Sequence, residues 1–128
     1  HPRIVVSDIE SRIGTRYTAD TLRALHHRHS RHRFVWIMGA DNMVQFSAWY
    51  RHRNISRLMP MAVIDRPGFS YQAVSAGRKL PARRLQPARM AGQLARRTLV
   101  NASWCFITGK RHNASATALR ASLRSHAD

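Results

Sequence analysis

Ser115, Thr117 and Arg120 form the most informative polar group of this 128-residue sequence. They follow an apolar run at 104–107 and a turn, which predicts a buried strand, a loop and a helix capped by Ser115. The first backbone N–H groups of a helix are unpaired and carry partial positive charge, so they attract anions. Two hydroxyl groups and an arginine beside them suit a phosphate ligand. An ordinary helix cap with a surface arginine gives the same pattern.

Polar residues also follow two other predicted strands. Asp41 comes after an apolar run at 34–38, and Arg66 comes after an apolar run at 61–64. Ligands of parallel sheets bind at the carboxyl ends of the strands, where these side chains would meet. The pattern therefore predicts a nucleotide site that includes Asp41 and Arg66. Each residue also has a simpler interpretation, since Asp41 suits a helix cap and Arg66 precedes a Pro-Gly turn.

Short apolar runs alternate with helical patterns along the chain, which indicates an α/β fold with a parallel sheet covered by helices on both faces. Helices are expected from the Thr18 cap, from the Asp41 cap, and around Ile55 and Leu58. The region 78–98 is basic and weakly patterned, so it is interpreted as helix or loop. Trp36 and Trp104 lie inside apolar runs and are predicted to belong to the core. The strands are expected at 4–6, 34–38, 61–64 and 103–107.

Length and composition favour a single domain over 1–128. The sequence is 44% hydrophobic and contains one cysteine, Cys105, which we expect to be a reduced core thiol. No apolar run approaches the roughly 20 residues that span a bilayer. The first residues lack the apolar segment of a secretory signal. We therefore expect a cytoplasmic protein without a membrane partner.

The charge of the chain is strongly positive. It has 22 Lys and Arg against 6 Asp and Glu, a formal net charge of +16 and a pI near 11.9. Such a surface attracts nucleotides and nucleic acids alike, so a basic nucleic-acid-binding module without catalysis is the alternative function. The basic segments 23–33 and 78–97 contain no aromatic residue. A nucleic-acid surface usually combines both residue types, which favours the nucleotide site.

Histidines at 26–32 have spacings that place pairs on one helix face, as in some zinc sites. Arg28, Arg31 and Arg33 surround them, and no carboxylate or thiol is nearby in the sequence to complete a ligand set. We therefore interpret this stretch as a solvated basic surface and predict no metal site.

Five blocks of the sequence, in this order and approximate spacing, resemble bacterial nicotinate-nucleotide adenylyltransferase, a nucleotidyltransferase with a Rossmann-like fold. No single block is decisive, but together they extend over essentially the whole chain. The blocks are Glu10 with 14–22, Gly39-Ala40-Asp41-Asn42-Met43, Phe46-Ser47-Ala48-Trp49-Tyr50, Arg66-Pro67-Gly68 and Ser115-Ala116-Thr117-Ala118-Leu119-Arg120.

The resemblance implies transfer of AMP from ATP to nicotinate mononucleotide, which gives deamido-NAD and pyrophosphate. It implies Mg²⁺ as well, bound mainly by the phosphates. By similarity, Trp49 stacks on the nicotinate ring, while Thr18 and the Tyr50 backbone N–H hold its carboxylate. Taken alone, Trp49 suits a core aromatic equally well, and Thr18 suits a helix cap.

The resemblance also assigns the phosphate-binding residues. Arg66 would lie near the substrate phosphate, and Asp41 near the nucleotide sugars and phosphates. The ATP phosphates would be bound by Ser115, Thr117 and Arg120.

One departure from the family pattern concerns catalysis. The family's first strand leads into a Gly-x-Phe-x-Pro-x-His-x-x-His loop that nothing in this chain matches. The histidines at 26–32 follow the wrong element, so the catalytic role is not transferred to them. We therefore expect an N-terminally truncated domain that lacks the first strand and helix. Such a domain would expose apolar parts of the neighbouring strands and would be inactive.

Overall fold

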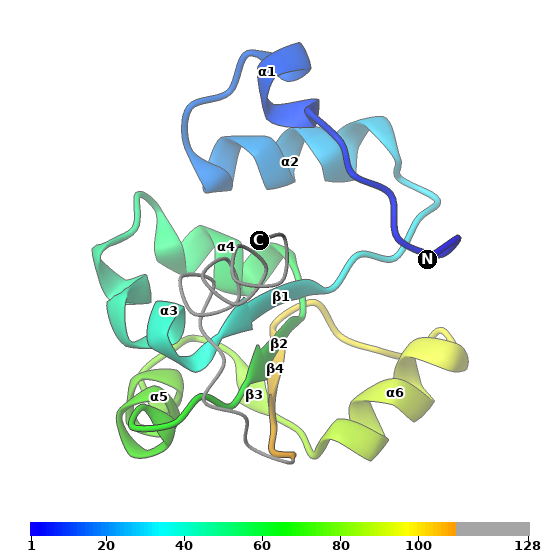
Figure 1. Ribbon diagram of the computed structural model, residues 1–128. Coiled ribbons are helices and arrows are strands. Elements are labelled where there is room, and N and C mark those ends of the chain that lie inside the picture. Colours follow the sequence, from blue (N-terminus) through cyan, green and yellow to red (C-terminus); the bar gives the residue numbers. More distant parts are fainter. Residues whose placement is uncertain (110–128) are drawn as a thin grey trace, which may run out of the picture.

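Four parallel strands form the centre of the computed structural model, which describes residues 1–109 of the chain. They are arranged in the order β1-β2-β4-β3, so the prediction of a parallel sheet is confirmed (Figure 1). The apolar runs become the strands because both faces of the sheet are buried at most positions. The strands are β1 (Trp36–Gly39), β2 (Met61–Ile64), β3 (Arg83–Arg84) and β4 (Ser103–Ile107).

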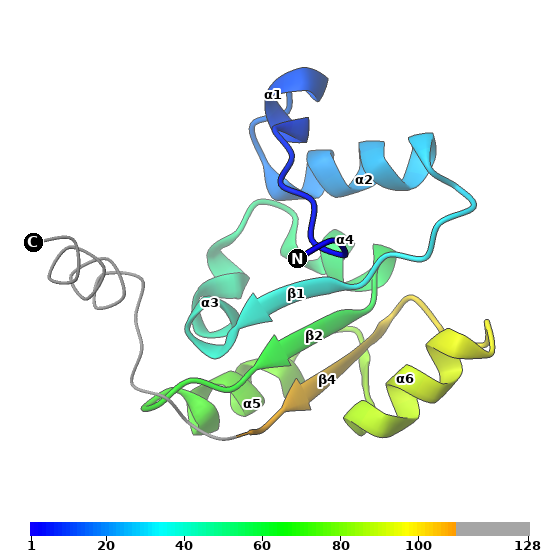
Figure 2. The same ribbon diagram turned by 45° about the vertical axis from the view of Figure 1, so that its right-hand side comes forward.

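Helices lie on both sides of this sheet, as the alternating pattern predicts. Helices α3, α4 and α5 lie on one side and α6 on the other, while α1 and α2 lie together next to α4 (Figures 1 and 2). The helices are α1 (Ile9–Ile13), α2 (Thr18–Arg28), α3 (Ala40–Gln45), α4 (His52–Leu58), α5 (Ser70–Arg78) and α6 (Pro87–Ala95), with a short 3-10 helix, η1 (Phe46–Ala48). None of them combines the length and the apolar character that crossing a bilayer requires, within residues 1–109.

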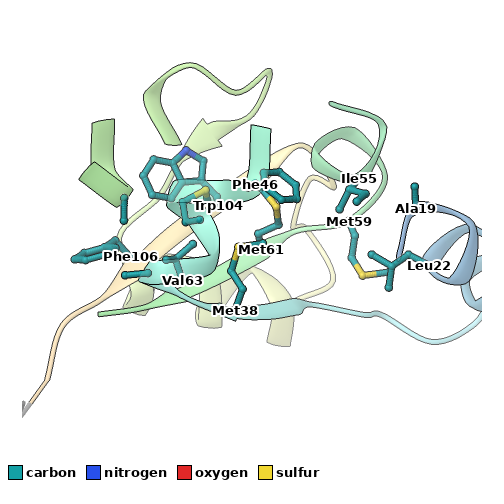
Figure 3. Close-up of a cluster of buried hydrophobic side chains, with 13 residues drawn as sticks. Ala19, Leu22, Met38, Phe46, Ile55, Met59, Met61, Val63, Trp104 and Phe106 are labelled. Carbon is teal, nitrogen blue, oxygen red and sulfur yellow. The ribbon is translucent and has the colours of Figure 1, made fainter. Parts of the chain in front are cut away.

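The core has two parts because neighbouring strand residues point to opposite faces of the sheet. Met38, Val63 and Phe106 share one register position and face the larger cluster, to which Phe46 and Ile55 of the helices also belong (Figure 3). Ala62 and Cys105 face a smaller cluster with Leu85 and with Met90 of α6. Cys105 and Trp104 were both predicted to belong to the core. The prediction is confirmed for both, since Cys105 is buried and Trp104 is only 1% exposed. Trp36 is half-buried and packs against the larger cluster.

Two predicted helix caps are wrong by one or two positions. Tyr17 is the cap residue of α2, with extended backbone, and Thr18 is the first helical residue. Gly39 caps α3, and Asp41 lies in its first turn. No side chain among residues 1–109 caps either helix. Thr18 and Asp41 therefore do not make the predicted capping hydrogen bonds.

The predicted strand at 4–6 is also wrong. Ile4, Val5 and Val6 have no strand partner within the described residues, and their exposed fractions rise from 71% to 96%. A short apolar run forms a strand only where a neighbouring strand pairs with it.

The region 78–98, in contrast, is more ordered than its pattern suggests. It holds the end of α5, the short β3, and α6, which begins with Pro87 and buries Met90. The apolar side of α6 packs on the sheet through Met90, which joins Leu85 and Cys105 in the smaller cluster.

Strand β1 has an open edge, since it pairs only with β2 among the described residues. Ile37 shares a register position with Ala62 and Cys105, yet its side chain is 65% exposed. Helix α6 packs against β4 and not against β1, so it leaves the side chain of Ile37 uncovered. The expectation that apolar parts of the strands are exposed is thus confirmed at Ile37.

Candidate functional site

Asp41 and Arg66 meet at the carboxyl ends of β1 and β2. Asp41 lies in α3 directly after β1, and Arg66 follows β2 by two residues. The Arg66 Nε atom lies 3.2 Å from the Asp41 Oδ1 atom, in an ion pair whose side chains are 48% and 40% exposed. Oδ1 itself is buried and has no hydrogen-bond partner among residues 1–109. The predicted convergence of these two residues is therefore confirmed, and both side chains remain partly open to solvent.

Gly39 makes this ion pair possible. A Cβ atom at this position would lie 2.5 Å from Asp41 Oδ1 and 2.6 Å from Arg66 Nε, closer than real Cβ contacts. The backbone of Gly39 has φ −77° and ψ 158°, which any residue adopts, so only space requires glycine here. The sequence contained a signal for this role, since Gly39 is the last residue of an apolar strand and immediately precedes a helix.

The three residues expected around the nicotinate ring line one pocket. Thr18 comes from the start of α2, whereas Trp49 and Tyr50 come from the segment between η1 and α4. The pocket has a volume of about 190 Å³ and is completed by Arg16 and Tyr17. Trp49 also packs edge-on against the buried Phe46, with ring centres 5.4 Å apart. Trp49 therefore packs against the core and also lines the pocket, while its stacking on a nicotinate ring stays a prediction.

The predicted Tyr50 belongs to a row of four side chains beside this pocket, Arg16, Tyr17, Tyr50 and Arg51, and sequence reasoning missed the other three. The Tyr17 and Tyr50 rings are 4.4 Å apart at an angle of 33°. The guanidinium of Arg16 lies 5.7 Å from the centre of the Tyr17 ring, and that of Arg51 lies 5.1 Å from the centre of the Tyr50 ring. The sequence did contain a signal for this row, because an arginine is next to a tyrosine in both segments, as Arg16-Tyr17 and as Tyr50-Arg51. We refer to these four residues as the Arg–Tyr ladder.

Proteins named probable nicotinate-nucleotide adenylyltransferase match almost the whole chain. One from Bradyrhizobium sp. (strain BTAi1 / ATCC BAA-1182) is 50% identical over 121 residues, which cover 93% of the chain and 62% of that protein. The chain is a relative of these adenylyltransferases.

Two further relatives with the same name support this result. One from Cereibacter sphaeroides (strain ATCC 17025 / ATH 2.4.3) is 43% identical over 97% of the chain and 65% of its own length. One from Ruegeria pomeroyi is 44% identical over 94% of the chain and 56% of its own length. No protein-family model matches the chain. The chain thus spans less than two thirds of the length of the adenylyltransferases that it resembles.

Three residues that the resemblance to the adenylyltransferases assigns to ATP lie outside the described residues. They are Ser115, Thr117 and Arg120, and their phosphate-binding role stays a prediction. The described chain reaches Gly109, two residues beyond the end of β4.

The described residues contain no group of three or more His, Cys, Asp or Glu side chains that would suit a metal ion. The histidines near the end of α2 make aromatic contacts instead. His29 and His32 meet edge-on with ring centres 5.4 Å apart, and His32 stacks on Phe34 at 6.0 Å.

Proposed function

We propose that this chain carries the mononucleotide-binding part of an adenylyltransferase that transfers AMP from ATP to nicotinate mononucleotide. One observation carries the proposal: Thr18, Trp49 and Tyr50, from two segments about thirty residues apart, line a single small pocket. The names of the relatives support the same reaction. The products would be deamido-NAD and pyrophosphate.

The pocket would hold the pyridine ring and its carboxylate. The Trp49 ring offers a flat apolar surface for stacking, and its contact with Phe46 fixes its orientation. The hydroxyl of Thr18 and the backbone N–H of Tyr50 would donate hydrogen bonds to the carboxylate. The pocket, with a volume of about 190 Å³, has room for a single six-membered ring.

Arg66 and Asp41 would act on the phosphates and sugars. Arg66 carries the positive charge that a phosphate requires, and its guanidinium is directed by the ion pair with Asp41. Residues Ser115, Thr117 and Arg120 would bind the phosphates of ATP.

The reaction then needs little covalent help from the protein. A phosphate oxygen of nicotinate mononucleotide forms a bond to the α-phosphorus of ATP, and the bond from that phosphorus to the bridging oxygen breaks as pyrophosphate leaves. Positioning and neutralisation of charge lower the barrier for such transfers. Mg²⁺ would enter with ATP, held mainly by the phosphates, since the described residues offer no metal-binding cluster of their own.

The direct test is an assay of the protein expressed from its complete gene with ATP, Mg²⁺ and nicotinate mononucleotide. Formation of deamido-NAD, identified by mass, and of an equal amount of pyrophosphate is expected. Trp49→Ala should raise KM for nicotinate mononucleotide about tenfold or more, since stacking on an aromatic ring is worth about 1–3 kcal/mol. Trp36→Phe, which changes a half-buried tryptophan outside the pocket, is the matched control. Absence of product from the unmodified protein would refute the proposal.

The net charge of +16 supports a second candidate, non-specific binding of nucleic acid. Binding of a labelled oligonucleotide should then weaken steeply as salt is raised, because each phosphate contact releases counterions. An affinity that survives moderate salt, or no binding at all, would exclude this candidate and leave the adenylyltransferase proposal unaffected.

A further inference from the structure

The Arg–Tyr ladder places a positive charge, that of Arg16, at one side of the proposed mononucleotide pocket. We infer that Arg16 determines the preference of this pocket for a mononucleotide whose ring bears a carboxylate over one whose ring bears a neutral amide. The inference rests on the proposed function and adds a specificity residue to it.

The position of Arg16 places its charge at the pocket. Arg16 lines the pocket together with Thr18, the residue proposed to hold the ring substituent. Its side chain is exposed, and no carboxylate among residues 1–109 forms an ion pair with it. The other lining residues, Tyr17, Trp49 and Tyr50, carry no formal charge at neutral pH. Among the described residues, Arg16 is therefore the one charged group that lines this pocket.

The ladder restrains where that charge lies. The Arg16 guanidinium is held over the Tyr17 ring, and Tyr17 is in turn stacked on Tyr50. This arrangement reduces the number of conformations that the Arg16 side chain loses when a carboxylate binds. Arg51 caps the other end of the ladder and does not line the pocket, so it adds positive potential without direct contact.

The charge distinguishes the two candidate ligands. A ring carboxylate is attracted by Arg16, whereas a carboxamide of almost the same shape gains no charge interaction. The hydrogen bonds from Thr18 and Tyr50 alone would distinguish them less, because an amide oxygen accepts such bonds too. For a partly solvated pair, a discrimination of about fivefold is expected from the charge alone.

The experiment compares kcat/KM for nicotinate mononucleotide with kcat/KM for nicotinamide mononucleotide, using protein expressed from its complete gene. Arg16→Gln should reduce the ratio of the two values about fivefold, mainly by raising KM for the nicotinate substrate. Arg16→Lys, which keeps the charge, should restore most of the ratio. Arg28→Gln, an exposed arginine of the same helix region outside the pocket, should leave the ratio unchanged.

The outcomes separate this inference from the proposed function. If Arg16→Gln turns over substrate with an unchanged ratio, or weakens both substrates equally, the inference is overturned and the proposed function stands. If the unmodified protein turns over neither mononucleotide, the proposed function fails and the inference fails with it.

Discussion

The guanidinium of Arg66 lies 3.2 Å from the carboxylate of Asp41, over a glycine, Gly39, that has no side chain to obstruct the contact. The three residues join the ends of two neighbouring strands. An ion pair as exposed as this one contributes little to folding, typically below about 1 kcal/mol. Its consequence is therefore expected in substrate binding and catalysis rather than in stability.

The first prediction concerns Gly39→Ala. The added methyl group must displace the Asp41 carboxylate or the Arg66 side chain, and misplacement by about 1 Å can cost about a hundredfold in rate. We expect kcat/KM for adenylyl transfer to fall about ten- to a hundredfold while the midpoint of thermal unfolding changes by only a few degrees. Steady-state kinetics and a thermal melt on the same sample test this. Full activity of the variant would show that the ion pair has no role in the reaction.

The second prediction concerns the helical glycines. In α5, a Cβ atom at Gly77 would overlap the Cζ2 and Cη2 atoms of the buried Trp104 ring. Gly77→Ala should therefore destabilise the fold by about 1–3 kcal/mol, measured by urea unfolding.

The matched control for Gly77→Ala is Gly92→Ala in α6. There the added Cβ would meet only the flexible end of the Arg96 side chain, at 2.9 Å. Higher helix propensity should make this variant neutral or more stable by up to about 1 kcal/mol. Equal destabilisation of the two variants would contradict the role of Trp104 packing.

The third prediction concerns the hydroxyl of Thr18. Within the described residues it forms no hydrogen bond and caps no helix, so its removal should leave stability almost unchanged. Thr18→Val should raise KM for nicotinate mononucleotide about tenfold, as expected when a charged ligand loses a hydrogen bond. Thr18→Ser keeps the donor and should stay close to the unmodified protein. A Val variant with normal KM would remove Thr18 from the site.

The fourth prediction concerns Cys105. Burial raises the pKa of its thiol, and the side chain is only 2% exposed. At pH 8 a thiol reagent should therefore modify the folded protein slowly and the urea-unfolded protein quickly. Folding stability should be fully retained below the unfolded-state pKa, near 8.5, and decrease at higher pH as the unfolded thiol ionises first. Rapid modification of the folded protein would show that the small core cluster opens readily.

The sequence predicted the strands that are buried on both faces and failed where an element depends on its neighbours. The run at 61–64 is a strand with the same bounds in the structure, and its first three residues are buried because the sheet is covered on both faces there. The equally apolar Ile4, Val5 and Val6 pair with nothing among the described residues. The apolar pattern of one segment does not show whether another strand is available to pair with it.

The candidate site shows the same division. Asp41 and Arg66 were predictable because strand ends converge in every parallel sheet. The pocket around Thr18, Trp49 and Tyr50 followed only from resemblance, since no periodicity indicates that two distant loops will meet. Arg16 and Tyr17 escaped both routes, because a tyrosine stack and a cation above it exist only in three dimensions.

The Arg–Tyr ladder also constrains which substitutions this region can accept during evolution. Tyr17 and Tyr50 each supply the ring on which the other rests, so replacing one leaves its partner and the adjoining arginine without a surface. The two tyrosines should therefore be tolerated or lost together. Among divergent relatives, a chain that has replaced one of them is expected to have replaced the other.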